Sequence, residues 1–174
     1  YTLEVTAARP RQPLSTRIET VHEFRSVPRR DRTALPLLAV RLAPRGLDDL
    51  NRAPAGTATT ADVRVERYGP APVTALTVEL SRDDGDTWQE VDVRRSGHGW
   101  VAHLPAQEPG FVSLRAVARD AHGNAVTQTI TRAYAVAIDS RVDRPGMSIG
   151  GAFVRPWTRG REAAWNEQET RNPA

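Results

Sequence analysis

Residues 81–88, with the sequence Ser-Arg-Asp-Asp-Gly-Asp-Thr-Trp, constrain the fold of this chain more than any other segment. They lie between two runs in which apolar and polar residues alternate, which is the pattern of a strand with one buried face. The alternating apolar residues are Leu76, Val78 and Leu80 before the segment and Val91 and Val93 after it. Asp and Gly between two such runs are turn residues. The segment therefore predicts a β-hairpin.

Several residues of this hairpin turn have a role that the sequence predicts. We expect Gly85 at positive φ, because the chain must reverse there and a Cβ would clash. Asp83 should accept hydrogen bonds from backbone amides of the turn, since Asp side chains commonly close turns in this way. Ser81 belongs to the same turn, and Trp88 should pack across the base of the hairpin. We also expect Trp88 and Trp100 in or near the core, with sugar stacking as the alternative role.

The alternating pattern continues on both sides of the hairpin after residue 60. We expect strands near residues 63–67, 73–81, 87–94, 100–104, 111–119 and 126–134, separated by turn signals such as Asp120, Gly123 and Asn124. In the strand from residue 111 the apolar positions share one parity and should face the core: Val112, Leu114, Ala116 and Ala118. Short strands at this spacing predict an all-β chain with an antiparallel immunoglobulin/fibronectin-III-like β-sandwich over residues 60–136.

The segments on either side of that sandwich have a different character. Residues 1–45 contain three strand-like runs broken by prolines, and we expect them to be the end of an upstream, incomplete β-domain that does not fold alone. Residues 46–59 have the composition of a linker, whereas residues 60–136 should fold alone. Residues 137–174 should form an irregular tail with one short helix at 161–169, anchored by Phe153 and Trp157 if it is ordered. The start at Tyr1, without Met, suggests a piece cut from a longer polypeptide.

Composition excludes several classes of protein. All 24 basic residues are Arg, interleaved with 21 acidic residues to a net charge of +3, so there is no basic stripe for nucleic acid. The absence of Cys excludes disulfides and thiolate metal sites. No run approaches the roughly 20 apolar residues of a membrane span.

The chain contains no recognisable catalytic motif. There is no Gly-x-Ser-x-Gly elbow and no His-Glu-x-x-His pair. The four histidines are His22, His98, His103 and His122, and we expect them to be solvated or hydrogen-bonded rather than catalytic. We therefore predict no catalytic residue and no cofactor, and no peptidase or esterase activity of the chain itself.

Calcium is the metal that the acidic turn could bind. Asp83, Asp84 and Asp86 converge in one segment, and oxygen-rich turns bind Ca²⁺. The spacing lacks the distal bidentate Glu of an EF-hand. Turn-forming acids are the favoured interpretation, and a calcium site is the alternative.

Two blocks of this sequence resemble a known family. The first runs from Leu14-Ser15-Thr16-Arg17 to Phe24-Arg25-Ser26 and on to Leu35-Pro36-Leu37-Leu38-Ala39-Val40. The second includes the 81–88 segment, Gly110-Phe111-Val112-Ser113-Leu114-Arg115-Ala116 and the run from Asp120 to Gln128. In this order, over about residues 1–136, they resemble the region that follows the catalytic domain in large secreted subtilisin-family serine peptidases of actinobacteria.

The resemblance implies a non-catalytic accessory region of a secreted, extracellular serine peptidase. Its partner would be the catalytic domain of the same precursor, and its role would be folding, stability or substrate capture. The Gly-Thr-Ser-Met-Ala motif that surrounds the nucleophile in that family is absent here, in agreement with a non-catalytic part. The tail after residue 136 matches nothing in the family.

Other interpretations of the hairpin remain open. The pattern Ser81-x-Asp83-x-Gly85-x-Thr87-Trp88 also satisfies the Asp box of sialidases and other β-propellers, but a propeller needs several blades and this chain has one box. A similar hairpin, followed by an Asp-x-x-Gly-Asn turn, is found in the immunoglobulin-like dimerisation domain of sulfite-oxidase relatives. The alternative function is therefore an oligomerisation, carbohydrate-binding or protein-binding module unrelated to proteolysis.

Overall fold

The computed structural model describes residues 1–26 and 34–138 of the chain, and these residues lie in one compact unit. They form strands, turns and loops without a helix, so the all-β prediction is confirmed. Within the same residues there is accordingly no helix long and apolar enough to cross a membrane. The predicted helix at 161–169 and the anchors Phe153 and Trp157 lie outside the described residues.

Ten strands make up this unit. In chain order they are β1 (Thr2–Ala8), β2 (Arg17–Glu23), β3 (Leu38–Pro44), β4 (Arg52–Pro54), β5 (Thr59–Arg67), β6 (Val73–Ser81), β7 (Gln89–Ser96), β8 (Gly99–Leu104), β9 (Gly110–Asp120) and β10 (Ala125–Ala137).

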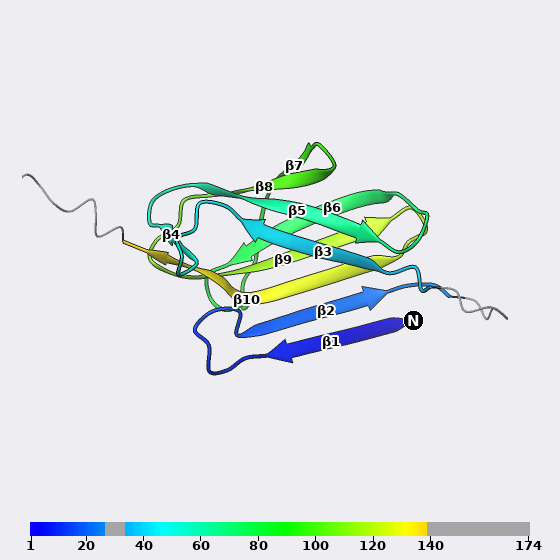
Figure 1. Ribbon diagram of the computed structural model, residues 1–174, viewed down its shortest axis with the longest axis horizontal. Coiled ribbons are helices and arrows are strands. Elements are labelled where there is room, and N and C mark those ends of the chain that lie inside the picture. The colour runs from blue at the N-terminus through cyan, green and yellow to red at the C-terminus, as the bar shows by residue number, and fades with distance from the viewer. Residues whose placement is uncertain (27–33, 139–174) are drawn as a thin grey trace, which may run out of the picture. The chain divides into compact units, whose positions relative to one another are not determined.

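The strands pair into one continuous sheet that curls on itself (Figure 1). Its order is β1-β2-β10-β9-β6-β7-β8-β5-β3, all antiparallel, and the short β4 pairs parallel with β10. Strand β7 joins the two halves, because its Val91 lies opposite Val78 of β6 whereas its Val93 lies opposite Ala102 of β8. We call β1-β2-β10-β9-β6 the first layer and β8-β5-β3 the second layer. Strand β3 contacts β9 and β10, so the two layers face each other as in a sandwich.

The core lies between these layers, where each strand presents one parity of side chains. The residues Val112, Leu114, Ala116 and Ala118 of β9 are all 0% exposed, as the alternation predicted. Burying an aliphatic side chain of the size of Val or Leu contributes about 1.5–3 kcal/mol. The second layer contributes a matching set of buried side chains: Leu38, Val40, Ala61, Val63, Ala102 and Leu104. Trp100 is half-buried and packs against this cluster, close to its expected place.

The predicted division into an upstream domain, a linker and a sandwich is not what the structure shows. Strand β2 pairs along its length with β10, and β3 pairs with β5 as the edge of the second layer. The expected linker at 46–59 contains β4, whose Ala53 is 4% exposed. A fragment beginning at residue 60 would therefore lack part of its core. The prediction failed because alternation shows that a strand has a buried face but not which strand it pairs with.

Candidate functional site

The turn between β6 and β7 is closed by side chains of its own residues. The Ser81 hydroxyl accepts a hydrogen bond from the Gly85 amide at 2.8 Å and donates to the Asp83 carboxylate at 2.7 Å. Asp83 also accepts from the Thr87 amide at 2.9 Å and from the Thr87 hydroxyl. These bonds, the Thr87 hydroxyl first, hold the pKa of Asp83 well below its usual range. Gly85 has a φ of 108°. The predicted roles of Gly85 and Asp83 are confirmed.

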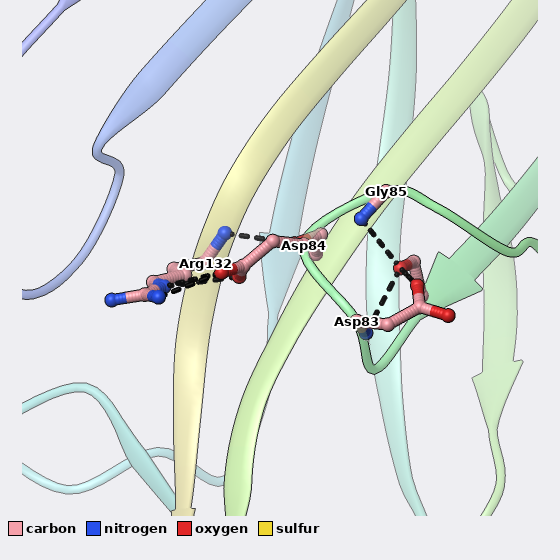
Figure 2. A network of polar contacts seen from close by, with 6 residues as sticks. Asp83, Asp84, Gly85 and Arg132 are labelled. Atoms are coloured by element: carbon pink, nitrogen blue, oxygen red, sulfur yellow. Dashed lines mark hydrogen bonds and ion pairs between the residues drawn. The ribbon is translucent and has the colours of Figure 1, made fainter.

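Asp84, the next residue, points away from the turn and binds an arginine of β10. Figure 2 shows Asp83 and Asp84 directed to different sides, with Asp84 facing Arg132. The guanidinium Nη2 lies 2.6 Å from one carboxylate oxygen, and Nε lies 3.0 and 3.1 Å from the two oxygens. This bidentate pair lowers the pKa of Asp84. Both residues have positive φ, 59° for Asp84 and 54° for Arg132.

Arg132 occupies a bulge where several segments meet. Between Ile130 and Tyr134, strand β10 has two residues more than the facing part of β9. The Arg132 amide donates to the buried Ser113 hydroxyl at 2.9 Å, and the Arg132 carbonyl accepts from the Ser15 amide at 2.8 Å. Its guanidinium carbon lies 4.6 Å from the centre of the Phe111 ring. Arg132 thus connects the 81–88 turn, β9 and the loop that precedes β2.

Trp88 packs on the outside of the first layer and not in the core. Its ring lies 3.3 Å from the position that a Cβ would take at Gly85, and the Arg115 guanidinium carbon lies 4.3 Å from the ring centre. Arg115 also forms an ion pair with Glu79 at 2.6 Å, across β9 and β6. Odd-numbered residues of this part of β9, Arg115 among them, face away from the core. Trp88 is therefore half-buried and packs on the outer face of the sheet at the base of the hairpin. The prediction that Trp88 packs across that base is confirmed, and the expectation of a position in or near the core is wrong for this residue.

A second closed turn lies between β9 and β10, at the predicted residues Asp120, Gly123 and Asn124. The Asp120 carboxylate accepts hydrogen bonds from the His122 amide, the Asn124 amide and the Asn124 side chain, at 2.8 to 2.9 Å. Asp120 and Asn124 are 6% and 3% exposed. The Asn124 side-chain oxygen in turn accepts from the Arg25 amide at 3.1 Å, 99 residues away in sequence. This turn therefore also fixes the end of β2 to the sandwich.

None of the four histidines forms a nucleophile–base pair in the described residues. The rings of His98, His103 and His122 are on exposed residues, and Nδ1 of the half-buried His22 has no hydrogen-bond partner. In residues 1–26 and 34–138, no hydrogen bond joins a hydroxyl to a histidine ring, and no group of three His, Asp or Glu side chains lies close enough to hold a metal. The calcium alternative at Asp83, Asp84 and Asp86 thus lacks convergent ligands, since the first two carboxylates serve different partners.

An open hollow of about 480 Å³ lies on the outer face of the second layer, lined by residues that include Arg41, Asp62, Arg64 and His98. Three of its charged side chains take part in surface ion pairs, Arg41 with Glu66 at 2.7 Å and Asp62 with Arg45 at 2.6 Å. Such exposed pairs contribute about 0–1 kcal/mol each. We interpret the hollow as part of a solvated sheet face.

Two residues of the turn region were missed by sequence reasoning. The bulge at Arg132 adds an even number of residues, so the alternation of β10 continues unchanged on both sides of it and contains no signal. Arg82 binds the Gln107 side chain at 3.0 Å and the Pro109 carbonyl at 3.2 Å, which ties the same turn to the β8–β9 loop. No local pattern indicates either long-range contact.

Comparison with known proteins finds no protein-family model that matches the chain, and no curated protein that is significantly similar to it.

Proposed function

We propose that this chain is a non-catalytic accessory module of a secreted subtilisin-like serine peptidase, in which it supports the folding and stability of the enzyme. The observation that carries the proposal is that the polar clusters of the chain have structural roles. In the described residues, Ser81 with Asp83, Asp84 with Arg132, and Asp120 with Asn124 each close a turn or join strands. A domain built in this way is suited to act as a rigid support.

The placement of the two sequence blocks behind the family resemblance also supports the proposal. The first block supplies β2 and the start of β3, and the second supplies the 81–88 turn, β9 and the first part of β10. Strand β2 of the first block pairs with β10 of the second across more than 100 residues of sequence, and β10 pairs with β9. Two blocks that fold as one unit are expected to occur together in relatives.

We further propose that the module belongs to the immunoglobulin/fibronectin-III type. Strands β10-β9-β6-β7 and β3-β5-β8 follow the order of the two facing sheets in such sandwiches. On that interpretation the β1–β2 hairpin is an addition at the edge formed by β10.

The parentage is testable on the native protein. Antibodies raised against this chain would be used to recover its parent from the culture medium and cells of the source organism. The recovered material would then be treated with a serine-directed fluorophosphonate probe and sequenced by mass spectrometry. We expect the antigen in the medium, on a polypeptide or stable complex that carries a labelled serine in a subtilisin-type motif.

Two controls sharpen this experiment. The recombinant chain alone should take no label, and preincubation with a non-fluorescent serine-protease inhibitor should abolish the label on the native material. A parent that is cell-associated, or recovered without any labelled serine, would refute the peptidase assignment. If the parent is a peptidase, deletion of residues 1–138 should reduce its yield and thermal half-life while leaving the kcat of the remaining active enzyme unchanged.

A further inference from the structure

Strand β1 is the outer edge of the first layer. One of its long sides has no neighbouring strand among residues 1–26 and 34–138, and Figure 1 shows it next to β2 alone. All residues of Thr2–Ala8 are exposed. The segment contains no Pro, Lys or Arg and one charged residue, Glu4. Natural edge strands are usually protected by such residues or by a bulge, because a bare edge pairs with strands of other molecules.

Hydrogen bonds at both ends of β1 show which of its residues face this edge. Tyr1 and Phe24 exchange two bonds, at 2.8 and 3.0 Å, and the Arg9 amide donates to the Thr16 carbonyl at 2.7 Å. Residues of an antiparallel strand point their backbone groups alternately to either side. The odd-numbered residues therefore pair with β2, and the even-numbered residues direct their N–H and C=O groups to the free edge: Thr2, Glu4, Thr6 and Ala8.

The side chains of the odd-numbered residues form an exposed apolar row. Tyr1, Leu3 and Val5 are 77%, 41% and 52% exposed. The register places Leu3 opposite His22 and His22 opposite Val126, a core residue. The row thus lies on the face of the first layer that bears the core. It lies beyond the part of that face that β3 covers, since β3 contacts β9 and β10. Apolar side chains in this position are suited to contact with another protein surface.

We propose that β1 pairs antiparallel with β1 of a second copy of this chain, about a two-fold axis that passes through Val5. In this register Thr2 lies opposite the second copy's Ala8, and Glu4 lies opposite the second copy's Thr6. All edge-facing residues of both strands then have a hydrogen-bonding partner. The sheet continues from one molecule into the other.

Neighbouring registers are less favourable. A shift that centres the axis on Glu4 places the two Glu4 carboxylates opposite each other and leaves Ala8 unpaired, and like charges in that position destabilise a strand pair. Centring on Thr6 leaves Thr2 unpaired. Intermediate shifts bring edge-facing residues opposite residues that already bond to β2. Charge and hydrogen bonding therefore select the register centred on Val5.

The same register joins the apolar rows of the two molecules. Val5 meets the second copy's Val5, and Leu3 meets the second copy's Ala7, in non-hydrogen-bonded pairs where side chains approach most closely. The second copy as partner follows from this self-complementarity of charge, hydrogen bonding and apolar side chains. It is independent of the proposed relationship to a peptidase.

The association state of the full 174-residue chain tests the proposal, by sedimentation equilibrium over a range of concentrations. We expect a monomer–dimer equilibrium for the native sequence and loss of the dimer in Thr6→Pro, whose missing N–H faces the free edge and not β2. Thr6→Ser is the matched control and should still form dimers. An unchanged thermal transition shows that the variants fold. A native chain that stays monomeric at all concentrations, or a dimer that Thr6→Pro leaves intact, would overturn the proposal.

Charge and cross-linking variants test the register itself. Thr6→Lys places a positive charge opposite the second copy's Glu4 and should tighten the dimer, whereas Thr6→Glu should weaken it, each by about three- to tenfold in Kd through two symmetric pairs. The chain has no Cys, so Val5→Cys should form a single disulfide between copies under mild oxidation. Leu3→Cys lies opposite Ala7 and should not. Cross-linking by Leu3→Cys but not by Val5→Cys would refute the register.

Discussion

The buried carboxylate of Asp120 should be one of the most sensitive positions of this fold. It is 6% exposed and accepts three hydrogen bonds, two of them from Asn124, whose amide is itself buried. Asp120→Ala would leave these donors without an acceptor in a place that water reaches poorly. A hydrogen bond to a charged group contributes about 1.5–3 kcal/mol, and an unsatisfied buried donor costs about 1–3 kcal/mol. Because the three bonds share one turn and are not additive, we expect a total loss of about 3–5 kcal/mol.

The effect should extend to the N-terminal hairpin. Asn124 is held in place by Asp120 and in turn accepts the hydrogen bond of the Arg25 amide. Asp120→Ala should therefore speed hydrogen exchange at Arg25 and along β2, in addition to lowering the free energy of unfolding. Asn124→Ala should cost less, about 1–2 kcal/mol, and the two losses should be coupled in a double-mutant cycle.

Urea denaturation followed by tryptophan fluorescence gives the free energies, and exchange followed by NMR gives the local effect. Asp86→Ala is the matched control, since Asp86 is exposed and should change stability by less than about 0.5 kcal/mol. A loss below about 1 kcal/mol for Asp120→Ala would refute the reasoning. So would a loss of normal size with unchanged exchange at Arg25, which would show that the turn does not hold β2.

Further outcomes follow from the other turn and from the core. Gly85→Ala should cost about 1–3 kcal/mol in urea denaturation, because φ is 108° and the new Cβ would lie 3.3 Å from the Trp88 ring. Trp88→Ala should cost about 1–2 kcal/mol, less than a fully buried Trp, and added Ca²⁺ or oligosaccharide should not alter its melting temperature. Since the pKa of Asp84 is lowered, its pairing stabilises the fold above pH about 4 and this contribution is lost as pH falls; Arg132→Gln should reduce that acid sensitivity in pH-dependent melting. Burial raises the pKa of Tyr134 to about 12, so ultraviolet titration should show a late-ionising phenol that Tyr134→Phe removes, and stability should fall as pH rises from about 10.

The sequence predicts the local features of this fold well. The hairpin turn, the positive φ of Gly85, the acceptor role of Asp83 and the buried parity of β9 all depend on neighbouring residues, and all are confirmed. In each case the physical cause acts within one strand or one turn. Local alternation and turn chemistry therefore suffice.

Long-range pairing is the part that the sequence does not reveal. The alternation of β2 is satisfied equally by an upstream sheet or by β10, and only the folded chain shows that Ile18 lies opposite Ile130. The contact between Asp84 and Arg132 likewise joins residues 48 positions apart, without a pattern around Arg132 to indicate it. Pairing between distant strands is decided by the packing of the whole core and not by either segment alone.

The attachment of β2 to β10 has a consequence for synthesis on the ribosome. The β1–β2 hairpin needs only its own short turn to form, but its anchor at Asn124 is made 99 residues after Arg25. At about 5–20 residues per second, the hairpin must wait about 5–20 seconds for its partner strand to be translated. During this interval β2 lacks the strand β10 with which it pairs, and the loop that must then close is long. Docking of the hairpin is therefore expected to be a late event in the folding of a nascent chain.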